Sequence, residues 1–112
     1  MDNKQRYFDS TLRLTATFLS RWSGVLVQLW DLTPYHRSLR IVLGTDPSSG
    51  RNLVLSCLEP VRIMGPVAWQ NSNLKVETTM LPDGNAGFAI RDQLVGFEVL
   101  CSALEVKENI KL

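Results

Sequence analysis

Apolar and polar residues alternate along several short stretches of this chain, the pattern of a β-strand with one buried face. In residues 74–80, apolar side chains and a threonine alternate with Lys75, Glu77 and Thr79. Residues 82–85 follow with the sequence Pro-Asp-Gly-Asn, a composition typical of tight turns. We therefore expect a strand over 74–80 that ends in a turn.

The same alternation predicts a hairpin built from strands at 39–43 and 53–63, with a loop over 46–50. Pro60 lacks an amide proton, so it predicts an edge position, a bulge or a break in the second of these strands. Gly65 and Pro66 end that strand. Further alternating stretches occupy residues 88–90 and 95–103.

The N-terminal third fits two patterns. We expect strands at 11–19 and 25–30, because three β-branched threonines alternate with apolar residues in the first of them. The alternative is a helix, since other apolar residues recur at spacings of three, four and seven. Gly24 interrupts that stripe, and glycine costs about 1 kcal/mol against alanine inside a helix. The residues of the helical stripe are Phe8, Leu12, Leu19, Trp22, Leu26 and Leu29.

About seven short strands with short connections predict a mostly β protein, either an antiparallel β-sandwich or a strongly curved sheet. An N-terminal helix would make the fold α+β instead. The 112 residues suit one domain, so we expect a single β-rich domain over 1–112. A composition of 45% hydrophobic and 21% charged residues is close to the globular average and excludes a disordered chain.

The net charge of +1 does not favour a nucleic-acid partner. Residues 1–40 carry six basic and three acidic side chains, whereas residues 82–112 carry three and five. No apolar run is long enough to span a membrane, and the N-terminus lacks the apolar region of a secretion signal. We therefore expect a cytoplasmic location and no membrane partner.

Few residues in this chain are of types that bind metals or act as nucleophiles. Cys57, Cys101 and His36 are the only cysteines and the only histidine, too few to predict a metal site or a cofactor. Both cysteines lie in apolar alternating runs, which favours free thiols in a core, with a single disulfide as the alternative. A hydrolase that pairs a cysteine with His36 is our third functional hypothesis.

Tryptophan, tyrosine and arginine gather near predicted strand ends and loops. These residue types are enriched at interaction hot spots, so they are our candidate binding residues. The alternative is that the tryptophans close the ends of a small β-core. The candidates are Trp22, Trp30, Tyr35, Arg37, Arg40 and Trp69.

Residues 65–72 combine a rigid Gly-Pro pair with Trp69 and Asn71, which predicts a corner that anchors a tryptophan. The segments LVLSCLEPVRIMGPVAWQNSNLKV (53–76) and GFEVLCSALEV (96–106) resemble small bacterial β-rich domains of unknown function. Some of those domains are described as immunity-type proteins of toxin systems. The resemblance implies a partner-binding role and transfers no catalytic residue.

The first hypothesis is therefore a non-enzymatic domain that binds a protein partner or itself. The long alternating strand near 95–106 suggests a homodimer formed by strand addition at a sheet edge. The runner-up is a small-molecule-binding β-domain in which Trp22, Trp30 or Trp69 lines a cavity.

Overall fold

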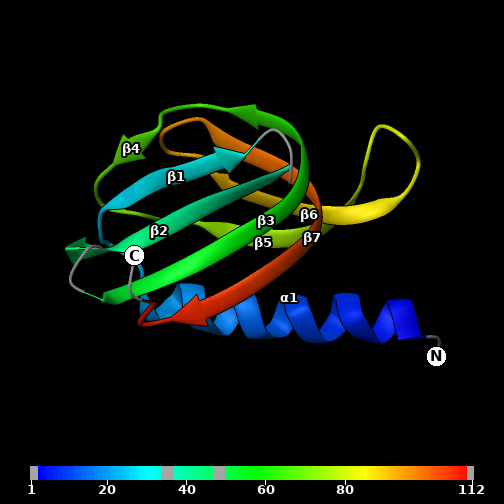
Figure 1. Ribbon diagram of the computed structural model, residues 1–112, viewed down its shortest axis with the longest axis horizontal. Helices are drawn as coiled ribbons and strands as arrows, with labels where there is room; N and C mark the ends of the chain where they lie inside the picture. The colour runs from blue at the N-terminus through cyan, green and yellow to red at the C-terminus, as the bar shows by residue number, and fades with distance from the viewer. Residues whose placement is uncertain (1–2, 34–36, 47–49, 111–112) are drawn as a thin grey trace.

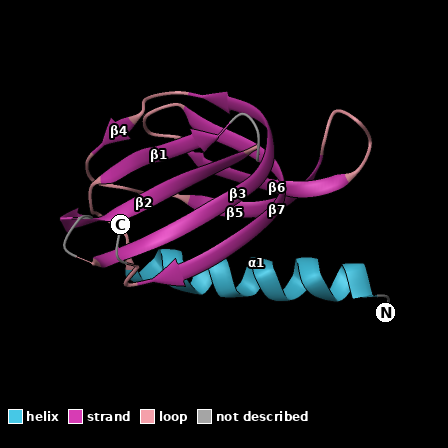
Figure 2. Ribbon diagram, viewed as in Figure 1, coloured by secondary structure: helices cyan, strands magenta, loops and turns pink. Residues whose placement is uncertain are grey.

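The computed structural model describes residues 3–33, 37–46 and 50–110. Within these residues one helix precedes seven strands, and Figure 2 shows the strands as a curved layer above the helix. The elements are α1 (Asn3–Arg21), β1 (Val27–Thr33), β2 (Ser38–Asp46), β3 (Arg51–Met64), β4 (Ala68–Trp69), β5 (Lys75–Met80), β6 (Ala86–Asp92) and β7 (Phe97–Glu108).

Residues 11–19 lie in α1, so the strand expected there is wrong and the helical alternative is confirmed as far as Arg21. Leu29, the last residue of the helical stripe, lies in β1, which agrees with the strand expected near 25–30. Phe8, Thr15 and Leu19 are buried on one side of α1, and Leu12 packs against the same core. Alternation would have placed Leu14 on the buried face, yet it is half exposed. The stripe at spacings of three and four buries more apolar surface and decides the conformation. Among the described residues, no helix has the length and apolar character that crossing a membrane requires.

The strands form one antiparallel sheet in the order β4-β1-β2-β3-β7-β6-β5. Figure 1 shows this sheet curling over α1, with β3 bending sharply on its way to β4. A mostly β fold built on a strongly curved sheet is thus confirmed, with the N-terminal helix of the alternative. Most neighbours are consecutive hairpin partners, but the pairing of β3 with β7 joins distant parts of the sequence.

The predicted hairpin of β2 and β3 is confirmed. Asp46 still belongs to β2, and residues 47–49 of the expected loop lie outside the described residues. Near Pro60 the register between β3 and β7 shifts, which is the predicted bulge. Glu59 before it has a φ of 52°, and β2 pairs with β3 only as far as Leu58. A bulge increases the local bend and twist of a strand, which explains the curvature there.

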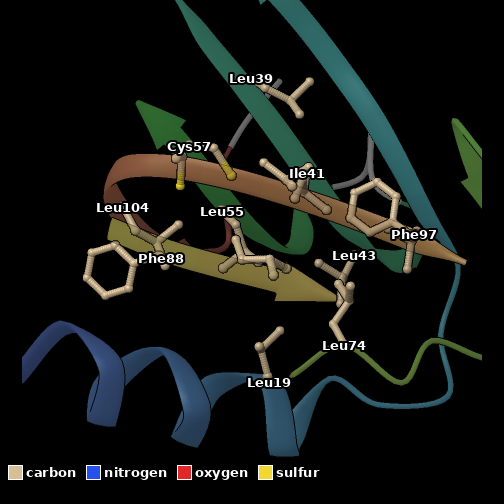
Figure 3. Packing of buried hydrophobic residues seen from close by; sticks show 14 of the residues in the cluster. Leu19, Leu39, Ile41, Leu43, Leu55, Cys57, Leu74, Phe88, Phe97 and Leu104 are labelled. Atoms are coloured by element: carbon tan, nitrogen blue, oxygen red, sulfur yellow. The ribbon is translucent and has the colours of Figure 1, made fainter. Parts of the chain in front are cut away.

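The core lies between the inner face of the sheet and α1. In Figure 3, Leu19 points from the helix toward Leu74 and Leu43. β7 contributes Cys101 and Leu104 to the same core, although strict alternation had placed Ala103 there. The alternation of core-facing residues along β7 shifts beside the bulge in its partner strand, β3.

β7 is an interior strand, paired with β3 on one side and β6 on the other. Self-association through a free edge of the strand near 95–106 is therefore wrong. Its pairing with β6 extends only from Phe97 to Cys101. Beyond that point the Tyr7 hydroxyl of α1 donates to the carbonyl oxygen of Leu104 (3.2 Å) and accepts from its amide N–H (3.0 Å). The helix thus covers the part of this edge that β6 leaves open.

The predicted corner around Trp69 is confirmed. Trp69 is buried, and its ring centroid lies 4.6 Å from that of Phe97. Its indole Nε1 donates to Oδ2 of the buried Asp92 (2.8 Å), which also accepts the amide N–H of Asn73 (2.9 Å). Oδ1 of Asp92 accepts the amide N–H of Leu94 at 3.3 Å. One carboxylate therefore joins the β4–β5 connection to the β6–β7 turn.

Candidate functional site: the free edge of β5 and its groove

The three tryptophans do not form one surface. Trp69 is a core residue and offers little area to a partner. Trp22 packs against the core, and its Nε1 donates to Oε2 of Glu108 (2.7 Å). Trp30 is half-buried on β1, directly opposite Arg40 of β2. Trp22 and Trp69 therefore close parts of the core, as the alternative interpretation expects.

Of the remaining candidates, Arg37 is exposed in the turn just before β2, with a φ of 48°. Its carbonyl oxygen accepts the amide N–H of Glu59 (2.6 Å). Tyr35 and His36 lie outside the described residues. The sheet thus brings only Trp30 and Arg40 directly opposite each other among the described candidates.

The two cysteines are free, fully buried and adjacent in the core. A hydrogen bond to the thiol of Cys101, together with burial, raises the pKa of the Cys57 thiol well above its usual value. A thiol with a raised pKa remains protonated and is a poor nucleophile. The environment of Cys57 is therefore that of a core residue.

We expect both thiols to resist iodoacetamide at neutral pH while the protein is folded, and to react once it is denatured in urea. Mass spectrometry of the alkylated chain would show this as zero labels before and two labels after unfolding. Rapid labelling of native Cys57 at pH 7 would contradict the burial described here and return weight to the hydrolase hypothesis.

β5 stands at one end of the sheet, and no described strand pairs with its outer edge. The opposite terminal strand, β4, has two residues, whereas β5 has six. The amide N–H of Leu81 bonds to Asn85 across the β5–β6 hairpin (2.7 Å). Backbone groups alternate in direction along a strand, so those of Val76, Thr78 and Met80 point to the free edge. A regular register between Lys75 and Met80 supports this assignment.

A groove follows this edge, because α1 runs antiparallel beside β5. At one end, Gln5 and Phe8 face residues 78–80 across a cavity of about 370 Å³. At the other, Leu19 and Ser20 face residues 73–76 across a cavity of about 360 Å³. Between them lies a third cavity of about 630 Å³, lined by Asp9, Leu12, Arg13, Ala16, Val76, Glu77 and Thr78. The free edge therefore has space beside it along its whole length.

Charges of alternating sign cross the outer face of the sheet and stop at β5. Arg62 pairs with Glu98 (3.4 Å), Glu98 with Arg91 (2.7 Å), and Arg91 with Glu77 of β5. Lys75 stands directly opposite Arg91 in the register. Like charges in opposed positions disfavour each other, so the residue opposite Lys75 in the hairpin does not stabilise its charge.

The groove contains no candidate metal centre. Over the described ranges, no group of three or more histidine, cysteine, aspartate or glutamate side chains could hold a metal ion. What the site offers instead is unpaired backbone on an edge strand, a mixed polar and apolar groove, and two charged side chains.

The alternation of residues 74–80 identified β5 as a strand, but nothing in that segment says that it ends the sheet. Edge position depends on pairings between distant segments, above all β3 with β7. One sequence signal was available. Lys75 and Glu77 lie two residues apart, and charged side chains are common on edge strands.

No protein-family model matches this chain, and no curated protein or solved structure is detectably similar to it. Its function therefore has to be argued from its own residues.

Proposed function

We propose that this protein is a non-enzymatic interaction domain that binds protein by strand addition at the free edge of β5. The observation that carries the proposal is this edge, where the backbone groups of Val76, Thr78 and Met80 face a groove instead of another strand. Strand addition uses such groups for affinity and the neighbouring side chains for specificity.

The side chains of β5 also support a binding role. Glu77, Thr78 and Met80 are exposed, and Met80 retains 75% of its accessible surface. An exposed methionine beside a groove lined by Phe8 and Thr78 gives an incoming strand apolar surface to cover. The rest of the β5–β6 hairpin is firmly held, since β6 is buried over most of its length.

Thr78→Pro tests the proposal. Proline removes the amide proton of residue 78, which points to the free edge, and leaves the hydrogen bonds between β5 and β6 intact. Thr78→Val is the matched control, because it changes the exposed side chain and keeps the amide proton. In pull-downs from the native host, we expect wild type and Thr78→Val to retain a stoichiometric partner or further copies of the chain. Thr78→Pro should weaken this binding about tenfold, which corresponds to about 1.4 kcal/mol.

Thermal unfolding must show that Thr78→Pro remains folded. Equal capture by Thr78→Pro and wild type would show that the edge is not the binding surface. A wild-type chain that is recovered alone and is monomeric by light scattering would contradict an interaction role.

A further inference from the structure

Four symmetric ways of pairing β5 with a second β5 keep the hydrogen-bonding alternation and pair at least three residues of each strand. The inward and outward backbone groups alternate, so only outward residues can form hydrogen-bonded pairs with each other. For a symmetric antiparallel pair, the two-fold axis then passes through Val76, Glu77, Thr78 or Thr79. Within β5 the number of hydrogen-bonded pairs is one about Val76, two about Glu77 or Thr79 and three about Thr78, so a register about Val76 has to be favoured by its side chains.

Charge separates the four registers. An axis at Glu77 places two glutamates opposite each other, which is unfavourable. An axis at Thr78 places Glu77 opposite Thr79, and an axis at Thr79 places neither Lys75 nor Glu77 opposite a residue of β5, so both leave the charges unmatched. An axis at Val76 places Lys75 of each copy opposite Glu77 of the other, twice. In that register the two charged positions form non-hydrogen-bonded pairs, in which side chains come closest, with Cα atoms about 4.5 Å apart.

This register also completes the charge pattern of the outer face. Within one copy, alternating charges run from Arg62 through Glu98 and Arg91 to Glu77. With the axis at Val76, this series of alternating charges continues from Glu77 to Lys75 of the second copy. Lys75, which faces Arg91 in its own hairpin, gains a carboxylate neighbour. The surface is therefore complementary to itself.

The groove provides room for the second strand. A two-fold axis between antiparallel strands stands perpendicular to the sheet, so both α1 helices lie on the same face of the joined sheet. The two cavities on either side of the axis, about 360 and 630 Å³, share Ala16 and Val76 as lining residues. Ala16 is small and exposed, which leaves the helix side of the groove open at the axis.

We infer that the occupant of the β5 edge is a second copy of this chain, paired antiparallel about Val76 and held in register by two Lys75–Glu77 pairs. This inference rests on the proposed use of the β5 edge and adds the identity of the partner. The dimer would be a continuous fourteen-stranded antiparallel sheet formed from the described strands of two copies.

Charge reversal tests the register. Lys75→Glu should raise the dimer dissociation constant about tenfold or more, because it places two glutamate pairs across the axis. The same substitution puts a carboxylate opposite Arg91, so the fold itself should not be weakened. Glu77→Lys should also impair dimerisation. An equimolar mixture of the two variants should form a heterodimer, because each glutamate then faces a lysine.

Analytical ultracentrifugation of each variant, of the mixture and of the Lys75→Glu/Glu77→Lys double variant measures these states. Recovery in the mixture and in the double variant is the expected result. A wild-type chain that stays monomeric up to about 1 mM, a weak limit for specific binding, would overturn the inference. So would a dimer that neither single reversal affects. If the wild type is monomeric and Thr78→Pro still weakens capture of a different protein, the proposed function stands and only the second copy is excluded.

Discussion

Replacement of Asp92 by alanine is expected to lower the free energy of unfolding by about 3 kcal/mol. Asp92 is buried and accepts hydrogen bonds from the indole of Trp69 and from the amide groups of Asn73 and Leu94. Removing the carboxylate leaves these donors without their acceptor inside the protein, and the cost of a buried unsatisfied donor is about 1–3 kcal/mol. Urea unfolding followed by tryptophan fluorescence measures the loss.

Two further variants show whether the hydrogen bonds are the cause. Asp92→Asn can keep an oxygen at the position that binds Trp69 and Asn73, so it should lose less stability than Asp92→Ala. Asp83→Ala is the matched surface control. Asp83 also accepts an amide N–H, that of Asn85 (2.9 Å), but it is exposed in the β5–β6 turn. We expect Asp83→Ala to cost less than about 1 kcal/mol, and similar losses at both positions would contradict the role given to Asp92.

Local features of the fold were predictable because neighbouring residues determine them. Alternation located β3, β5 and β6, Pro60 marked the bulge, and residues 65–72 indicated the corner that holds Trp69. The helix was misjudged because α1 carries both patterns at once. Its threonines alternate as in a strand, and only contacts with β5 and β7 show that the helical stripe is the buried one.

The candidate site was harder to predict because it is the edge of a strand that pairs with no other described strand. The edge position of β5 follows from the order of all seven described strands, and this order depends on contacts between residues far apart in the sequence. The tryptophans were a poor guide to the binding surface for a related reason. Its large ring favours cores and interfaces alike, and the partner that assigns Trp69 to the core, Asp92, is 23 residues away.

Gly65→Ala is expected to destabilise the protein by about 3 kcal/mol or more, since overpacking and backbone strain act together at this position. Gly65 follows β3 at the corner that leads to Trp69, with a φ of 109°. A Cβ atom there would lie 2.7 Å from the carbonyl oxygen of Gly96 and 2.7 Å from the Cα of Phe97. Both are backbone atoms, so the corner or the β6–β7 turn would have to move. Because Phe97 packs on Trp69, such a shift would also disturb the core.

Gly24→Ala separates the two causes. Gly24 also has a positive φ, 74°, but no atom lies within 4 Å of the position that a Cβ would occupy. It should therefore show only the cost of the left-handed conformation, about 1–2 kcal/mol. Thermal unfolding of the two variants side by side gives the difference. A Gly65→Ala variant no less stable than Gly24→Ala would show that the corner can yield at little cost. Trp69 would then not depend on a close approach between Gly65 and the β6–β7 turn.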